Sequence, residues 1–526
     1  MPVIAAISKL RWYRERPHPL KGEVYFMRKI PTSIATQHPD NAAAPFWQSK
    51  PFVSSAAEIE ESYICFSDLG IDEYNWDWEG KFVDEAVVDR LLHRYYKYFQ
   101  KNILGEGKFL TFRIPNPRIE KQFRLARAFM VAITSSQLAQ SLGFKNSPIF
   151  ETILPLTETA QEIIDIQEAF RDLVGVEHAL LKMKDSIQNI EIIPLFEQVD
   201  KIMASGEILK EYISFHKKRF GVKPEYIRPY CARSDPALNS GLIPTMLAVK
   251  VALSQYRLAE KESGVRFFPM VGTGSLPFRG GLTPTRIDES LENYAGVSTF
   301  TVQSAFRYDY PKSLVKKAVD KLKLELPQKR ARILSSSDIK RIQKVIPFFE
   351  KQYRESIEKG AGIINSIARQ FPKRRERLQH IGLFGYSRGV GRVKLPRAIV
   401  FTGALYSLGI PPEIIGTGRG IETAQKNGLW DIVSSTYTHL RDDLQEAGHF
   451  LNKENVARLA KDNPGWYEVL SDISLIEKEL GVELGPINSL HREHYNISSK
   501  VYQRSKKKKE FSQLITEAGK LRKSLG

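Results

Sequence analysis

The sequence predicts an α/β fold: a (β/α)8 TIM-type barrel with extensive additional α-helices, mainly C-terminal. Two features lead to this prediction. Between residues 108 and 304, short apolar segments alternate with longer segments of helical periodicity, and from about residue 336 onward the pattern is helical, broken by glycine-rich turns. Such alternation is typical of a parallel sheet with helices outside it, and a chain of 526 residues can form one such body with added helices.

The expected elements follow one another in a regular order. A helix over 85–103 precedes the first expected strand, 108–114. Further strands are expected over 148–154, 189–196, 225–232, 265–271 and 298–304, and the helices between them over 118–142, 157–171, 205–219 and 237–262. We therefore divide the chain into an N-terminal appendage (1–26), a catalytic barrel portion (27–330), a helical elaboration that completes the barrel (331–499) and a basic C-terminal tail (500–526).

The net charge of +18 is concentrated at the two ends of the chain. Residues 1–29 carry +5 and residues 500–526 carry +7, which leaves +6 on the body. A body this mildly basic suits small anionic substrates at least as well as a polyanion, so no nucleic-acid partner is expected.

Other compositional features favour a cytoplasmic protein without a membrane partner. No apolar run approaches the length that crosses a bilayer, and the apolar start precedes its basic residues, the reverse of a signal peptide. The two cysteines, Cys65 and Cys231, have no CxxC spacing, so neither a disulfide framework nor a zinc site is indicated.

Polar residues and glycines recur where the expected strands end. Arg113 ends the first strand, Glu197 and Asp235 follow two others, and Gln303 lies in the last. Glu151 lies inside its strand, and a glycine-rich loop follows 265–271. Because active sites of (β/α) barrels are built at the carboxyl ends of the strands, this pattern predicts a catalytic rim.

Glu197 and Asp235 are the candidate metal ligands. Carboxylate oxygens are what Mg²⁺ or Mn²⁺ takes when it keeps positions open for water and substrate. The residues alone leave a structural alternative equally open. Asp235 before Pro236 is also a good helix N-cap, and Glu197 can be a first-turn carboxylate that stabilises a helix dipole.

The glycine-rich stretch 271–284, VGTGSLPFRGGLTP, is a candidate anion-binding loop. Its glycines let backbone N–H groups approach an anion, and Arg279 adds a forked donor. The loop lacks the Walker A lysine, and Pro277 occupies the third glycine position of the dinucleotide fingerprint, so nucleotide binding is disfavoured. Solvated or capping roles remain equally open for Arg113, Gln303 and Arg307.

The stretch 36–41, TQHPDN, places an imidazole beside a proline and two capping residues. His38 can move a proton near neutral pH. Taken alone, an ordinary buried histidine ahead of a helix capped by Asp40 or Asn41 is the simpler interpretation.

Taken together, the motifs resemble one family, phosphoenolpyruvate carboxylase, most closely its shorter archaeal-type branch. TQHPDN is similar to the family's T-A-H-P-T motif, PLFEQVD (194–200) to P-L-F-E-T-I-D, and Asp235 takes the place of the aspartate in Y-S-D-S-x-K-D. The R-G-G, T-x-Q and L-R-A-I motifs are matched by 279–281, 301–303 and 395–399. Order and approximate spacing are kept, which is more specific than any single motif.

The resemblance implies carboxylation of phosphoenolpyruvate with bicarbonate to oxaloacetate and phosphate, through carboxyphosphate and a metal-stabilised pyruvate enolate. It implies Mg²⁺ (or Mn²⁺) on Glu197 and Asp235, and it makes His38 the base that takes the carboxyphosphate proton. Arg279 and Arg113 are then expected to be catalytic cations. Further substrate-binding residues are expected at Gly280, Gly281, Gln303 and Arg307.

The resemblance also implies a homotetramer and a dicarboxylate inhibitor such as aspartate or malate, for which Arg388, Arg392 and Asn488 are the nearest candidate ligands. The chain departs from the long-form motifs at Val271, Thr273 and Leu238, so the bicarbonate ligands are left unassigned. Two other classes remain: another barrel enzyme acting on phosphoenolpyruvate or pyruvate, and a nucleic-acid-binding protein.

Overall fold

The computed structural model describes residues 28–79, 83–120, 123–176, 187–376, 389–390 and 393–526. The expected appendage 1–26 and two of the expected effector ligands, Arg388 and Arg392, lie outside the described residues.

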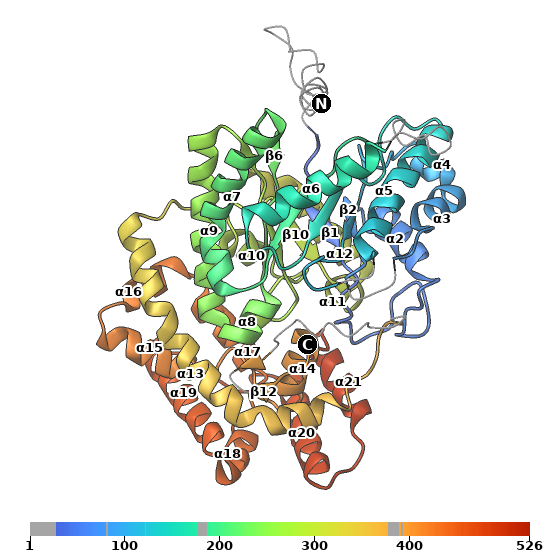
Figure 1. The fold of residues 1–526 in the computed structure, drawn as a ribbon. Helices are drawn as coiled ribbons and strands as arrows, with labels where there is room; N and C mark the ends of the chain where they lie inside the picture. Colours follow the sequence, from blue (N-terminus) through green and yellow to red (C-terminus); the bar gives the residue numbers. More distant parts are fainter. Residues whose placement is uncertain (1–27, 80–82, 121–122, 177–186, 377–388, 391–392) are drawn as a thin grey trace.

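Eight parallel strands form a closed barrel in the order β1-β10-β9-β7-β5-β4-β3-β2 (Figure 1). The strands are β1 Ser33–Ala35, β2 Glu73–Asp77, β3 Phe109–Arg113, β4 Glu151–Leu154, β5 Glu191–Phe196, β7 Tyr230–Ala232, β9 Met270–Gly272 and β10 Thr299–Val302. Pairing of β1 with β10, in which Ile34 lies opposite Thr301, closes the barrel. The predicted fold class is confirmed. All eight strands lie before residue 303, so the C-terminal helices contribute none of them.

Helices follow the strands, and the longer ones cover the outside of the barrel (Figure 1). They are α2 Glu58–Ser67, α3 Val87–Arg94, α4 Tyr96–Phe99, α5 Arg124–Ser141, α6 Ala160–Val174, α7 Val199–Phe220, α8 Ser234–Ser240, α9 Leu242–Ser263, α10 Ile287–Asn293, α11 Ser304–Tyr308 and α12 Lys312–Glu325. Two short 3₁₀ helices are η2 Pro277–Arg279 and η3 Leu326–Gln328.

Two of the expected strands are each divided in two. The segment 225–232 forms β6 Tyr226–Ile227 and β7, and 265–271 forms β8 Arg266–Phe267 and β9. Pro229 and Pro269 lie in the two interruptions and have no N–H to donate to a ladder. As a result, β6 and β8 pair with each other outside the barrel.

The barrel interior near the amino ends of the strands contains a buried ion-pair cluster. Arg228 Nη2 lies 2.7 Å from Glu73 Oε2, and Arg228 Nη1 lies 2.7 Å from Glu151 Oε2. All three side chains are at most 2% exposed. Glu151, which the sequence placed inside its strand, is therefore part of this cluster.

A second layer of helices covers the carboxyl end of the barrel and is drawn below it in Figure 1. These helices are α13 Ser336–Ala368, α14 Ala398–Ser407, α15 Thr417–Lys426, α16 Trp430–Thr436, α17 Leu440–Gly448, α18 Lys453–Asp462, α19 Pro464–Leu480, α20 Ser489–Lys506 and α21 Ser512–Leu521. The short strands β11 Gly389–Val390 and β12 Val393–Lys394 pair between α13 and α14.

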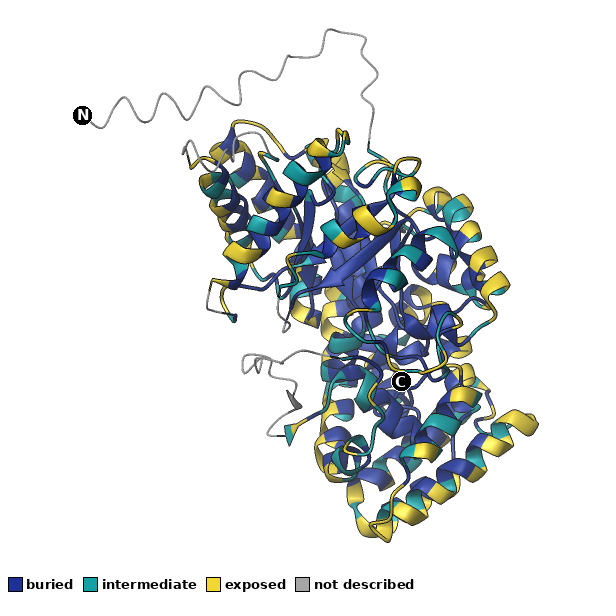
Figure 2. Cartoon of the chain, turned by 90° about the vertical axis from the view of Figure 1, so that its right-hand side faces the viewer, coloured by how far each residue is buried: buried dark blue, intermediate teal, exposed yellow. Residues whose placement is uncertain are grey.

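The last residues of the chain are buried between the barrel and these helices (Figure 2). Ser524 and Leu525 are fully buried, and the Leu525 N–H donates to the Asp40 carbonyl at 2.7 Å. The run 506–509 is exposed, as expected of a solvated basic face. The domain boundaries at residues 27, 331 and 500 stay predictions.

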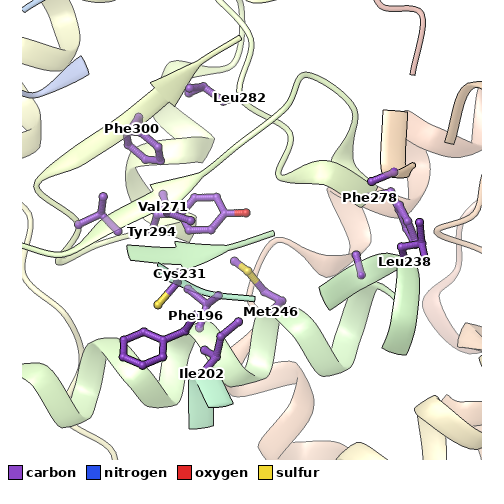
Figure 3. Close-up of a cluster of buried hydrophobic side chains, with 14 of the residues drawn as sticks. Phe196, Ile202, Cys231, Leu238, Met246, Val271, Phe278, Leu282, Tyr294 and Phe300 are labelled. Atoms are coloured by element: carbon purple, nitrogen blue, oxygen red, sulfur yellow. The ribbon is translucent and has the colours of Figure 1, made fainter. Parts of the chain in front are cut away.

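One large apolar core joins the barrel to its helices. Figure 3 shows part of it, where Phe196 and Cys231 from the barrel strands lie near Ile202 of α7 and Met246 of α9. Within the described residues, no helix is both long and apolar enough to span a bilayer.

Candidate active site

A cavity of about 460 Å³ lies at the carboxyl ends of the barrel strands, between the barrel and the C-terminal helices. Barrel residues on its wall follow β1, β2, β3, β5, β7 and β9: they are His38, Pro39, Glu79, Arg113, Glu197, Ser234, Asp235 and Arg279. The C-terminal part of the chain supplies Ala368, Phe371, Pro372, Lys373, Arg374, Arg375, Arg397, Ala398, Ile399 and Val400. Five of the predicted site residues therefore share one cavity.

Glu197 and Asp235 lie on the same wall, together with a third carboxylate, Glu79. Glu197 is 5% exposed and accepts the Leu156 N–H at 2.9 Å. It precedes α7, whose N-cap is Gln198, so it is not a first-turn residue. Asp235 is the second residue of α8, whose N-cap is Arg233, so the N-cap alternative for Asp235 is wrong.

The electrostatics of these carboxylates fit a bound cation. Burial, followed by the negative charges of Glu79 and Asp235, raises the pKa of Glu197 to about 8. Holding like charges together in a buried site is unfavourable unless a positive charge offsets them. Among the described residues, no cluster of three or more histidine, cysteine, aspartate or glutamate side chains is arranged to hold a metal ion. Two carboxylates, Glu197 and Asp235, are a donor set that Mg²⁺ commonly accepts.

Arg113 is held in a fixed orientation by two carboxylates. Its Nε and Nη2 donate to Asp77 at 2.9 and 2.7 Å, and its Nη1 lies 2.8 Å from Glu79 Oε2. Asp77 lies opposite Arg113 in the β2–β3 ladder, so the sheet register itself aligns this pair.

His38 lies in an irregular loop after β1, and no helix begins at Asp40 or Asn41. The His38 Nδ1 is 2.8 Å from Thr36 Oγ1, and the His38 carbonyl accepts the Ser304 hydroxyl. The Asp40 side chain instead accepts the Ala305 N–H at 2.7 Å, at the start of α11. The capping alternative for the segment after His38 is therefore wrong.

Arg279 is fully buried and is the best-connected cation of the site. Its Nε donates to Ser234 Oγ at 3.1 Å, and its Nη1 donates to Asp40 Oδ2 at 3.1 Å and to the Gly526 carbonyl. Its Nη2 donates to Gln303 Oε1. Burial lowers the pKa of Arg279, and the Asp40 carboxylate opposes that shift.

A family model described as phosphoenolpyruvate carboxylase matches residues 30–526, which is most of the chain. The chain belongs to the phosphoenolpyruvate carboxylase family.

Relatives that bear this name match along most of their length. The phosphoenolpyruvate carboxylase of Leuconostoc mesenteroides is 40% identical over 479 residues, covering 90% of this chain and 95% of that protein. The protein of that name from Metallosphaera sedula is 38% identical over 521 residues (95% and 100%), and the one from Pyrococcus horikoshii is 41% identical over 434 residues (80% and 89%). The archaeal relatives agree with the predicted resemblance to the archaeal-type branch.

The sequence did not reveal four cations that line the active-site cavity from the C-terminal part of this phosphoenolpyruvate carboxylase family member. Lys373, Arg374, Arg375 and Arg397 line the cavity from the C-terminal part of the chain. The segment PKRRER (372–377) is the only local signal for three of them, and a basic run is also typical of a solvated surface. Arg397 lies in the L-R-A-I motif but was not assigned to the site.

Of the glycines and polar groups predicted to bind substrate, Gly280, Gly281 and Gln303 surround Arg279 and are not on the cavity wall. Gly280 has φ +124°, and a Cβ there would lie 2.8 Å from Thr273 Cγ2, so only glycine fits. The Gly280 carbonyl accepts the Tyr294 hydroxyl at 3.1 Å.

Arg307 is fully buried and lies behind the cavity. Its Nη2 donates to the Thr36 carbonyl at 2.8 Å and to Glu61 Oε1 at 3.2 Å. Arg307 therefore holds the backbone that leads into the His38 loop.

Asn488 is the one predicted effector ligand among the described residues. It is exposed and is the N-cap of α20, where its side chain accepts the His491 N–H at 2.9 Å. It is not on the wall of the active-site cavity. An inhibitor site at this position stays a prediction.

Proposed function

We propose that the chain carboxylates phosphoenolpyruvate with bicarbonate to give oxaloacetate and phosphate. One observation carries the proposal: His38, Arg113, Glu197, Asp235 and Arg279 converge on a single cavity in a member of this family. Both substrates are anions, and the cavity wall contains cations from the barrel and from the C-terminal segment.

The first half of the reaction transfers the phosphoryl group. A bicarbonate oxygen attacks phosphorus while the bond from phosphorus to the enol oxygen breaks, which gives carboxyphosphate and the pyruvate enolate. Arg113 and Arg279 neutralise the phosphoryl and carboxylate oxygens. Because their partners fix both guanidinium groups beforehand, this stabilisation requires little reorganisation during the reaction.

The second half joins carbon to carbon. His38 takes the carboxyphosphate proton, CO₂ and phosphate separate, and the enolate carbon attacks CO₂ to form oxaloacetate. If Nδ1 carries the proton and donates to Thr36, Nε2 keeps the lone pair that a general base needs.

Glu197 and Asp235 would hold the Mg²⁺ or Mn²⁺ ion. When bound, the ion would supply positive charge for the oxygen atoms that become negative during the reaction. The raised pKa of Glu197 supports this assignment, because the carboxylate is deprotonated most readily with a cation beside it.

Direct substrate contacts of Gly280, Gly281, Gln303 and Arg307 stay predictions. Their observed contacts support a positioning role, in which Gln303 orients Arg279 and Arg307 holds the backbone before His38. The homotetramer and the dicarboxylate inhibitor also stay predictions.

The test is a coupled assay for oxaloacetate with the full chain, in the presence and absence of bicarbonate and Mg²⁺. We expect oxaloacetate and phosphate in equal amounts, and only when both additions are present. Pyruvate as the main product, or a requirement for a nucleotide, would contradict the proposal and favour a different phosphoenolpyruvate enzyme.

A further inference from the structure

A second cavity, of about 570 Å³, lies at the opposite end of the barrel from the candidate active site. Its wall includes Thr32 before β1, Pro269 before β9 and Ser298 before β10. All barrel strands are parallel, so the amino ends of these strands face away from the cavity that contains His38. Nothing in the proposed carboxylation requires this second cavity.

The charged side chains on the wall of the second cavity are mostly cationic. Arg257 and Lys261 lie one turn apart on α9, Arg266 lies on β8, and Lys329 and Arg330 follow η3. Among the residues that the structure describes, the wall contains a single carboxylate, that of Glu260, which accepts the Phe267 N–H at 3.3 Å. The lining is therefore strongly positive although its residues come from separate parts of the chain.

The segment that follows η3 is packed firmly into this wall. Arg257 Nη1 donates to the Ala331 carbonyl, and Arg330 Nη1 donates to the Pro327 carbonyl at 2.6 Å. Gly296 has φ +99°, and a Cβ there would lie 2.5 Å from Ala331 Cβ. This close approach holds Lys329 and Arg330 at the rim of the cavity.

Carboxylates do not neutralise most of these charges. In the part of the chain that the structure describes, Arg257, Lys261, Lys329 and Arg330 form no ion pair within 4.0 Å. Like charges on a concave, partly apolar wall reinforce one another and attract anions. Leu253, Val297 and Leu326 are buried and supply the apolar part of that wall.

We propose that this second cavity binds a small, multiply charged anion that carries phosphoryl groups. Arginine forks match phosphate oxygens, and lysines add point charges, so several cations against one carboxylate suit a ligand with more than one negative charge. The volume of this cavity is within the range of small-molecule sites. A cavity of this size is too small for a folded polyanion. The proposal does not depend on the carboxylase reaction.

The test is isothermal titration calorimetry of the metal-free full chain with inorganic pyrophosphate. The double variant Lys261→Gln/Arg330→Gln removes two exposed cations of the cavity. The control Lys340→Gln/Lys351→Gln removes the same charge from exposed positions of α13. We expect pyrophosphate to bind about tenfold or more weakly to the double variant, because charge-assisted contacts are lost, and to bind the control as it binds the parent.

Three results would overturn the proposal. The first is equal loss in the double variant and its control, which would indicate only a general charge effect. The second is unchanged binding in the double variant with loss in Lys373→Gln, which would place pyrophosphate in the active-site cavity. The third is tighter binding of tricarballylate than of pyrophosphate, which would assign the cavity to polycarboxylates. Because no turnover is measured, these results are independent of the carboxylation proposal.

Discussion

Charged side chains of the candidate active site are held by other charged groups before any substrate arrives. Asp77 and Glu79 orient Arg113, and Asp40 orients Arg279. The acidic partners hold the two arginine side chains in place, but they also offset part of the positive charge of these side chains. Residues 373–375 and 397 add further cations to the cavity wall from the C-terminal part of the chain, although Arg375 is itself paired with Glu61.

The two proposed metal ligands can be tested by the binding of Mg²⁺ as well as by catalysis. Mg²⁺ should raise the melting temperature of the parent and of Asp200→Asn, an exposed neighbour in the same motif that serves as the matched control. It should not raise that of Glu197→Gln or Asp235→Asn, whose oxaloacetate formation should also fall by at least about a hundredfold. An active Asp235→Asn enzyme that is still stabilised by Mg²⁺ would remove Asp235 from the metal site.

The role of His38 can be separated from its structural contacts by product analysis. His38→Asn should still transfer the phosphoryl group but fail to deliver CO₂ to the enolate, so phosphate and pyruvate should form in a bicarbonate-dependent way with little oxaloacetate. The three products are followed in parallel on protein whose circular dichroism matches the parent. If oxaloacetate remains the sole product at any residual rate, His38 is not the base.

At the scale of elements, the sequence predicted the apolar strands and missed the polar or short ones. β5, Glu191–Phe196, is a nearly continuous apolar run and was expected within two residues. β2, Glu73–Asp77, alternates polar with aromatic residues, because Glu73 lies in the buried ion-pair cluster and Asp77 holds Arg113. β1 has only three residues, which is too short for any periodicity. The alternation of β2 and the shortness of β1 therefore hid these two strands from a hydrophobic pattern.

The loop that contains His38 is held by an element that the sequence did not single out. Asp309, which follows α11, accepts the N–H groups of Ala42 and Ala43 at 2.7 to 3.0 Å. Burial raises the pKa of Asp309 to about 7. A carboxyl whose pKa is raised by folding stabilises the folded state most when protonated, so its contribution is lost as the pH rises from about 4 to 7.

Asp309→Asn should keep the hydrogen-bond acceptor and remove this titration. We expect the free energy of unfolding of the parent to fall relative to that of the variant, by on the order of 2 kcal/mol, between pH 4 and pH 7. Urea unfolding at several pH values measures the difference. Parallel curves for parent and variant would show that Asp309 stays ionised in the folded protein.

At the scale of the whole molecule, the candidate site depends on contacts between distant parts of the chain. The barrel half of the site could be predicted, because Arg113, Glu197, Asp235 and Arg279 end or follow expected strands. His38 follows a strand that was not expected, and it was found only through its resemblance to a family motif. The C-terminal half could not, because Arg374 and Arg375 reach the cavity only through tertiary contacts. Arg374, for example, donates to the Asn41 carbonyl at 3.1 Å, which joins it to the His38 loop.

Glu61 of α2 connects the two halves of the molecule. It accepts Arg375 Nη1 at 2.7 Å and Nη2 at 2.6 Å, and it also accepts Arg307. Burial acts to raise the pKa of Glu61. The positive charge of Arg375, followed by that of Arg307, outweighs this effect and lowers the pKa to about 2. The resulting stability is present above the unfolded pKa, about 4.5, and is lost as the pH falls towards 2.

Glu61→Gln should leave two buried arginines without their counter-charge. The variant should lose about 3 kcal/mol of stability at pH 7, and the deficit should shrink as the pH falls below about 4. Denaturant unfolding across this pH range provides the measurement, with Glu60→Gln, a partly exposed neighbour on α2 that pairs with Arg94 at the surface, as the control. A deficit that does not depend on pH would show that Glu61 contributes through packing and not through its charge.

The central claim, that bicarbonate attacks phosphorus in the cavity formed by His38, Arg113, Glu197, Asp235 and Arg279, is tested most directly by isotope transfer. Bicarbonate labelled with heavy oxygen is supplied with phosphoenolpyruvate and Mg²⁺, and the phosphate released is analysed by mass spectrometry. Attack by bicarbonate must leave one of its oxygens on phosphorus, so the account predicts phosphate that carries a single heavy oxygen together with labelled oxaloacetate. Unlabelled phosphate accompanying labelled oxaloacetate would mean that water attacks phosphorus, and it would contradict the account.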